Sequence, residues 1–195
     1  MKTWESSPIS LPPVPRTGGL HLSDVLNYME ITMGTDRGDD DVDYTQYRNL
    51  GFAWEYYLDA VLQDLVERPT EITEDGIIMT PDAIDMEGWV VEEWKATFKS
   101  IRPVLSSWPP HSEIDIDAFE YNYWRWFVQV KSYCRVMDTT RCRFRVLWIN
   151  GTYAGSGPIQ RVIEIDFTSR ELEENWAMVT NNARHAPIEN PEDRC

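Results

Sequence analysis

The stretch that decides the fold is Gly76-Ile-Ile-Met-Thr-Pro-Asp-Ala-Ile-Asp-Met-Glu-Gly-Trp-Val-Val-Glu-Glu-Trp-Lys-Ala-Thr-Phe98. β-branched and aromatic residues flank a central Glu-Gly pair, which is typical of two antiparallel strands joined by a turn. If that pair is a two-residue loop, the numbers of facing residues add up to 175, and Asp82 lies directly opposite Glu93. Strand period two then puts Lys95 on the same face as Glu93. The stretch predicts a hairpin that carries two facing carboxylates and an ammonium group.

Two facing carboxylates need compensation. Their Cβ atoms would be about 5 Å apart, where two unit charges repel by roughly 3 kcal/mol at an effective dielectric near 20. Either one carboxylate takes up a proton or a divalent cation lies between them, and ligation by oxygen alone favours Mg²⁺ or Mn²⁺. The alternative is a solvated hairpin in which Glu93 and Lys95 form a surface ion pair worth under about 1 kcal/mol.

A third acid stands in the apolar run of residues 48 to 66, which predicts a long helix over residues 45 to 67. Glu55 shares the stripe expected to face the core, because it precedes three leucines at helical spacing: Leu58, Leu62 and Leu65. An unpaired buried carboxylate is costly. Glu55 therefore either joins the two hairpin acids or reaches solvent at the edge of the stripe.

The hairpin resembles that of the PD-(D/E)XK nucleases, particularly their RecB-like and lambda-exonuclease-like branches. The resemblance rests on Pro81-Asp82 followed by Glu93-Trp94-Lys95. In that family the Asp, the Glu and the backbone after the Glu bind metal. The resemblance therefore implies Asp82, Glu93 and the backbone of Trp94 as ligands of one or two Mg²⁺ or Mn²⁺ ions, with Lys95 as the motif lysine.

Two further motifs extend the resemblance to roughly residues 20 to 182. RecB-like members carry a Gly-x-x-x-His motif upstream of the hairpin. Here the corresponding residues are Gly51-x-x-x-Glu55, and an acidic residue in place of the histidine resembles the lambda-exonuclease-like branch. Downstream, Gln129-Val-Lys-Ser-Tyr133 resembles a Gln-x-x-x-Tyr motif of RecB-like exonucleases. Arg125, Gln129 and Tyr133 form one line on a predicted helix, which either touches a nucleic acid strand or is an ordinary amphipathic flank.

Asp85 and Glu92 are the other acids of the hairpin and rivals for the metal role. Strand parity points both away from Glu93, so we expect Asp82 to be the ligand. A bulge after Pro81 would reverse that phase.

A strand is predicted by the alternating residues 141 to 149, and Asn150-Gly151 after it is a type I′ hairpin signal. Arg141, Arg143 and Arg145 share one face of this strand. They form either a solvated outer face or a track that contacts phosphates.

Composition sets limits on function. With 195 residues, 42% of them hydrophobic, the chain can bury one core. A net charge of −15 argues against a general DNA-coating protein, yet residues 95 to 145 hold nine Lys or Arg against five acids. Such a polarised surface suits a nuclease with a localised groove. Three scattered cysteines, Cys134, Cys142 and Cys195, exclude an iron–sulfur cluster and suit a reducing interior.

The chain is expected to comprise a Pro-rich arm (1–19), one nuclease domain (20–182) and a polar tail (183–195). We expect a short helix over residues 22–30 and three strands between residues 71 and 98. A helix over residues 117–137 follows, then two or more strands between residues 141 and 167, and finally a helix that is capped by Ser169. This order predicts a three-layer α/β fold, restriction-endonuclease-like, with a central mixed sheet flanked by helices. No apolar run is long enough to cross a membrane, and a cytoplasmic location is expected, in a host cell if a phage encodes the chain.

The resemblance implies a metal-dependent deoxyribonuclease, in the first place an exonuclease that leaves 5′-phosphate products in recombination, repair or phage DNA processing. Two alternatives stay open: a nuclease-fold module that binds DNA without activity, and an acidic DNA mimic that binds a basic protein. A homo-oligomer is open as well. The Pro-rich arm could bind a recombination protein or pack as an extended tail.

Overall fold

The computed structural model describes residues 17–34, 45–107, 112–155 and 157–188. The predicted Pro-rich arm up to residue 16 lies outside the described residues, as do Cys195 and the end of the predicted polar tail.

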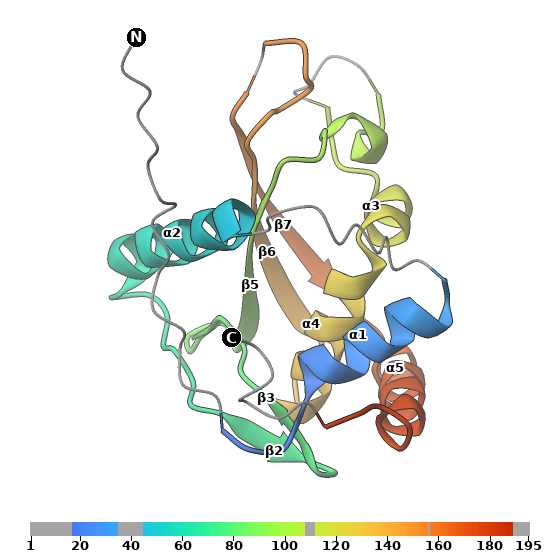
Figure 1. Cartoon of the computed structure of the whole chain (residues 1–195). Coiled ribbons are helices and arrows are strands. Elements are labelled where there is room, and N and C mark those ends of the chain that lie inside the picture. Colours follow the sequence, from blue (N-terminus) through green and yellow to red (C-terminus); the bar gives the residue numbers. More distant parts are fainter. Residues whose placement is uncertain (1–16, 35–44, 108–111, 156, 189–195) are drawn as a thin grey trace, which may run out of the picture.

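The described residues form two sheets and five α-helices (Figure 1). The elements are β1 (Leu20–His21), α1 (Leu22–Thr32), α2 (Thr45–Leu62), β2 (Ile72–Glu74), β3 (Ile77–Met79), β4 (Ala83–Asp85), β5 (Val90–Thr97), the 3₁₀ turn η1 (Arg102–Val104), α3 (Ile116–Asn122), α4 (Trp124–Val136), β6 (Arg141–Trp148), β7 (Ile159–Asp166) and α5 (Ser169–Ala183). The small sheet has the order β1-β3-β2 and the large sheet β4-β5-β6-β7. Both sheets are mixed, because β1 and β3 are parallel, as are β5 and β6, while the remaining pairs are antiparallel.

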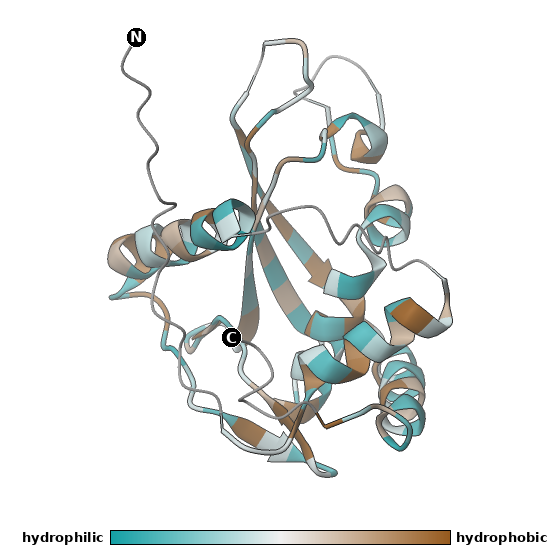
Figure 2. Ribbon diagram, viewed as in Figure 1, coloured by the Kyte–Doolittle hydropathy of each residue, from teal (hydrophilic) through white to brown (hydrophobic). Residues whose placement is uncertain are grey.

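The large sheet is the middle of three layers. On one face, Val91, Phe144 and Val146 pack with residues of α1, α3, α4 and α5 in the main core. On the other face, Trp94 packs with Trp54 and further apolar residues of α2. Hydrophilic and hydrophobic bands alternate along β6 (Figure 2), as strand period two requires of a strand with chemically different faces. The predicted α/β arrangement is therefore confirmed.

The hairpin register that places the acids is as predicted. Ala83 pairs with Glu92 and Asp85 with Val90, so the facing residues do add up to 175. The turn, however, spans residues 86–89 instead of two residues. The Asp85 carboxylate stabilises it by accepting hydrogen bonds from the backbone N–H groups of Glu87 and Gly88, at 3.1 and 3.0 Å. Trp89 closes the turn with φ of +50°.

The predicted helix over residues 117–137 is two helices, because the backbone breaks at Tyr123 (φ −130°, ψ 35°). The hydroxyl of Tyr123 accepts a hydrogen bond from Trp148 Nε1 at 2.9 Å, which fixes this residue against β6. Side chains on both sides of the break are nevertheless buried in one core, among them Phe119, Phe127 and Cys134.

Other predicted boundaries also shift. Helix α2 ends at Leu62, so Leu65 lies beyond it and is 66% exposed instead of facing the core. Thr168, and not Ser169, caps α5, with its side chain accepting from the Glu171 N–H. Four strands, not three, lie between residues 71 and 98.

Asn150-Gly151 does not form a two-residue hairpin, since Trp148 pairs with Ile159 and a ten-residue connection joins β6 to β7. Asn150 instead donates from Nδ2 to the carbonyl oxygen of Phe98 at 3.0 Å. This contact ties the connection to the end of β5. Within the described ranges, none of the helices has both the length and the apolar character of a membrane span.

Candidate active site

Asp82, Glu93 and Lys95 meet at the hairpin of β4 and β5. Asp82 immediately precedes β4, and its Oδ2 accepts a hydrogen bond from the backbone N–H of Trp94 at 2.7 Å. The Lys95 ammonium forms an ion pair with Glu93 Oε1 and lies 4.0 Å from Asp82 Oδ2. The register and strand period therefore bring together the three side chains that the sequence predicts.

Glu55 extends this group from α2. Its side chain is 29% exposed, and it is close enough to Asp82 and Lys95 to interact with both electrostatically. Burial, followed by the charge of Asp82, raises the pKa of Glu55, whereas the positive charges of Lys95 and Arg68 oppose that rise. Glu55 is therefore a partly buried acid directed towards the hairpin acids. Of the two alternatives for Glu55, the one in which it joins these acids describes its position.

Glu93 is fully buried, which is unusual for a carboxylate. Burial raises its pKa to about 8, although the adjacent Lys95 ammonium lowers it. Burial also lowers the pKa of Lys95, but Glu93, Asp82 and Glu55 together raise it above its ordinary value. Lys95 therefore stays charged, and the solvated surface ion pair considered above does not describe this buried pair.

The oxygen atoms of these acids suit a hard divalent cation. Neither oxygen of Glu93 accepts a hydrogen bond of good geometry from the described residues, so both keep lone pairs for another partner. As the side chains lie, no three His, Cys, Asp or Glu among the described residues surround a point that could hold an ion. The Lys95 ammonium lies between Glu93 and Asp82 and supplies the positive charge there. The carboxylate oxygens therefore fit a metal ion, provided that the Lys95 ammonium moves away from its place between Glu93 and Asp82.

Gln129 and Tyr133 reach the same region from α4. Tyr133 is 4% exposed, and its pKa is raised well above 10 by burial and then by the charges of Glu93, Asp82 and Glu55. Gln129 donates from Nε2 to the Tyr133 hydroxyl at 2.7 Å. Arg125, the third residue of the predicted line, is directed elsewhere. It pairs with Glu30 and donates to Asn27 Oδ1 at 2.7 Å, which joins α4 to α1.

The arginines of β6 are held by contacts within the protein. Across the parallel pair β5 and β6, Glu92 is in register with Arg143 and Trp94 with Arg145. Both arginines therefore lie on the face of the sheet opposite to Glu93. Their guanidinium groups bind the fully buried Glu92, with closest contacts of 2.7 Å from each. Arg143 and Arg145 neutralise a buried acid, and a track along which Arg141, Arg143 and Arg145 contact phosphates stays a prediction.

Arg141 and Asp85 complete this second set of contacts. Arg141 donates to the carbonyl oxygen of Gly88 at 3.0 Å, which holds the β4–β5 turn. Asp85 pairs with Arg143 at 3.1 Å. The two rival acids, Asp85 and Glu92, thus both point away from Glu93, as parity predicts, and the bulge that would reverse the phase is absent from the described hairpin.

Sequence reasoning missed Arg68, which follows α2. Its Nε donates to the backbone carbonyl oxygen of Asp82 at 3.1 Å, and Nη2 lies 3.5 Å from Glu55 Oε2. One signal could have found it: residues 45 to 94 contain twelve acids but only two basic residues, Arg48 and Arg68. A cation in so acidic a segment is expected to lie beside carboxylates.

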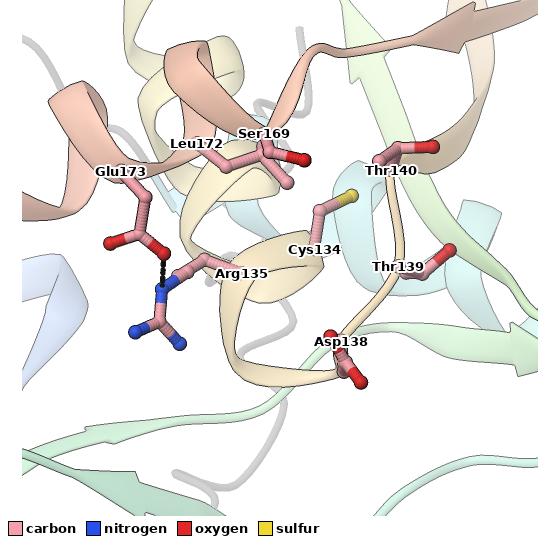
Figure 3. Close-up of a pocket in the computed structure, with 8 residues that line it drawn as sticks. All are labelled: Cys134, Arg135, Asp138, Thr139, Thr140, Ser169, Leu172 and Glu173. Atoms are coloured by element: carbon pink, nitrogen blue, oxygen red, sulfur yellow. Dashed lines mark ion pairs between the residues drawn. The ribbon is translucent and has the colours of Figure 1, made fainter.

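A pocket apart from this site is lined by two acids, Asp138 and Glu173, together with Arg135. It lies between the end of α4 and the start of α5, and Figure 3 shows Cys134, Thr139 and Ser169 around it. Arg135 at its rim is already paired with Glu173. Burial raises the pKa of the Cys134 thiol, which keeps it protonated and unreactive.

The structural role of Asp85 can be tested with Asp85→Asn. Hydrogen bonding from the Gly88 N–H, followed by Arg143, holds the pKa of Asp85 below its ordinary value of 3.8. Its stabilising effect is therefore present above that value and lost as the pH falls through the lower folded pKa. We expect Asp85→Asn to reduce the free energy of unfolding by up to about 1 kcal/mol at neutral pH. The difference from wild type should shrink in acid, as measured by urea unfolding, and a difference that does not depend on pH would contradict this assignment.

Comparison with known proteins points to the fold. No protein-family model matches the chain, and no curated protein matches its sequence. The crystal structure of a phage-related exonuclease from Haemophilus somnus 129PT superposes with a TM-score of 0.51 at 13% identity, covering 85% of this chain and 79% of that one. The chain shares the overall fold of that protein. The structure of the protein SSO0001 is also similar, with a TM-score of 0.50 at 15% identity, covering 89% of this chain and 77% of that one. At such identities the likeness concerns the fold alone.

Proposed function

We propose that this chain is a Mg²⁺- or Mn²⁺-dependent deoxyribonuclease of the PD-(D/E)XK type, and in particular an exonuclease. The observation that carries the proposal is the buried Glu93–Lys95 pair beside Asp82. Apart from the Lys95 ammonium, neither oxygen of this fully buried carboxylate has a hydrogen-bond donor of good geometry among the described residues, which is costly to stability. Such a cost is expected at a functional site. The nuclease-like fold, shared with a phage-related exonuclease, agrees with this chemistry.

Each residue has a distinct role in the proposal. Asp82, Glu93 and Glu55, with the backbone beside Trp94, would hold one or two ions. A bound divalent cation supplies polarisation of the scissile phosphate and a lowered pKa of water. Lys95 donates hydrogen bonds, which orient the attacking water and stabilise negative charge that develops on the phosphate. Hydrolysis would leave 5′-phosphate products.

In this proposal Gln129 and Tyr133 shape the site and do not take part in the reaction. The buried Tyr133 ring forms a wall of the site, and the Gln129 amide fixes its hydroxyl at 2.7 Å. Water is thereby excluded from the α4 side of Glu93, which strengthens the electrostatic interactions there. A homo-oligomer and a recombination protein bound to the Pro-rich arm stay predictions.

The decisive experiment compares the degradation of end-labelled linear DNA and covalently closed circular DNA in Mg²⁺, Mn²⁺ or EDTA. We expect degradation of the linear DNA with either ion, no degradation in EDTA, and loss of activity in Glu93→Gln. Cleavage of the circle as well would indicate an endonuclease. Cleavage in EDTA would refute the metal-dependent site, and DNA binding without cleavage in Mn²⁺ would favour the inactive module.

A further inference from the structure

Arg68 is the more accessible of the two cations at the site. Its side chain is 43% exposed, whereas that of Lys95 is 21% exposed and is ion-paired with the buried Glu93. A group that approaches from solvent therefore meets the guanidinium of Arg68 more readily than the Lys95 ammonium.

The contacts of Arg68 hold it in place without using all its donors. Nε donates to the Asp82 carbonyl oxygen at 3.1 Å, and the guanidinium carbon lies 5.5 Å from the centre of the Trp94 ring, as in a cation–π contact. The remaining interactions with acids are long, at 3.5 Å to Glu55 and 4.0 Å to Asp59. A guanidinium offers five N–H donors, and the described hydrogen bonds of Arg68 involve only Nε and Nη2.

The charge of the site requires such a group. Glu55 and Asp82 repel the phosphates of a nucleic acid, and Asp59 adds to this repulsion, whereas the charge of Glu93 is offset by the Lys95 ammonium. Planar guanidinium groups bind phosphate oxygens through two parallel hydrogen bonds, and they do so better than ammonium groups. The 3.5 Å contact with Glu55 is weak enough to be exchanged for a phosphate oxygen.

We infer that Arg68 is a phosphate-binding residue at the mouth of this site, where Nε stays on the Asp82 carbonyl and Nη2 passes from Glu55 to a phosphate oxygen of the substrate strand. This inference rests on the proposed function for the nature of its substrate. It has a second consequence: the exchange releases Glu55 from its contact with Arg68 when the strand is bound.

The test measures DNA binding separately from cleavage. A short fluorescein-labelled single-stranded oligonucleotide is titrated in EDTA with wild-type protein, Arg68→Ala, Arg68→Lys and the control Arg48→Ala. Arg48 is the matched control because it is the other basic residue of the acidic segment and is exposed on α2. Binding is followed by fluorescence anisotropy at several salt concentrations, and circular dichroism checks that each variant is folded.

We expect Arg68→Ala to raise the Kd about tenfold or more, the loss typical of a hydrogen bond to a charged group. The slope of log Kd against log salt should fall by about 0.7, the value for one phosphate contact of a single strand. Arg68→Lys should keep the slope and recover part of the affinity. Arg48→Ala should leave both unchanged.

Two outcomes would overturn the inference: a Kd and salt slope of Arg68→Ala that match those of Arg48→Ala, or no measurable DNA binding by the wild type. In the first case Arg68 only neutralises Glu55. Cleavage by the wild type in Mg²⁺, assayed in parallel, separates this failure from failure of the proposed function. Wild-type cleavage with unaltered binding by Arg68→Ala would refute the inference alone, whereas Arg68-dependent binding without cleavage would refute the nuclease alone.

Discussion

Lys95→Ala is expected to reduce the rate of Mg²⁺-dependent DNA cleavage by about 10²- to 10⁴-fold, the range for loss of a group that moves a proton or stabilises developing charge. The reason is positional, since the ammonium is paired with Glu93 and lies 4.0 Å from Asp82. No other side chain of β5 can replace it, because Lys95 is the one basic residue of that strand. Single-turnover cleavage of end-labelled DNA measures the effect.

Lys99→Ala is the matched control, because Lys99 lies just beyond β5 and is exposed. It should retain near wild-type cleavage. Lys95→Ala leaves Glu93 buried without its cation, so thermal unfolding in Mg²⁺ must show that the variant is folded at the assay temperature. A folded Lys95→Ala variant with full activity would disprove the proposed role of the lysine.

Glu92→Ala is expected to have the largest effect on stability, lowering the free energy of unfolding by about 3 to 5 kcal/mol. The carboxylate is fully buried and accepts hydrogen bonds from Arg143, Arg145 and the Trp94 indole. Removing it leaves two guanidinium groups, each 16% exposed, without their shared partner. Urea unfolding followed by tryptophan fluorescence measures the change.

Glu164→Ala provides the comparison, because this residue also pairs with Arg143 at 2.7 Å but is 58% exposed. Its loss should cost no more than about 1 kcal/mol, as is usual for exposed ion pairs. Equal effects of the two substitutions would show that burial does not determine the strength of this network. The contrast therefore tests how burial changes the strength of two ion pairs that Arg143 forms on one face of the sheet.

Local periodicity was sufficient to predict the hairpin and its acids. The alternation of side chains in the strands fixes which residues share a face, so Glu93 and Lys95 were correctly separated from Glu92. The register survived an error in the turn, because a four-residue turn centred on the same Glu87-Gly88 pair leaves every facing pair unchanged. Helical spacing likewise placed Glu55 on the inner stripe of α2.

Contacts between distant segments could not be read from the sequence. The pairing of the β6 arginines with Glu92 could not be predicted, because nothing local shows that β6 lies parallel to β5, with Arg143 beside Glu92. The position of Arg68 depends on how the chain returns from α2 to β4, where Glu67 and Ile84 form an isolated bridge. The break occurs at Tyr123, whose hydroxyl accepts a hydrogen bond from Trp148, a residue far along the chain. In each case tertiary contact overrides a local pattern.

The adjacent residues Glu92 and Glu93 project into opposite environments, one matched by two guanidinium groups from β6 and the other by the ammonium on its own strand. If only the β4–β5 hairpin were moved into another protein, the acids would be transferred without β6, whose arginines pair with Glu92. A shift of the strand register by one residue would then place Glu92 where Glu93 belongs, and no ion pair with β6 would disfavour that shift. The smallest portable unit of this centre therefore includes β6, together with the helical crossover that sets it parallel to β5.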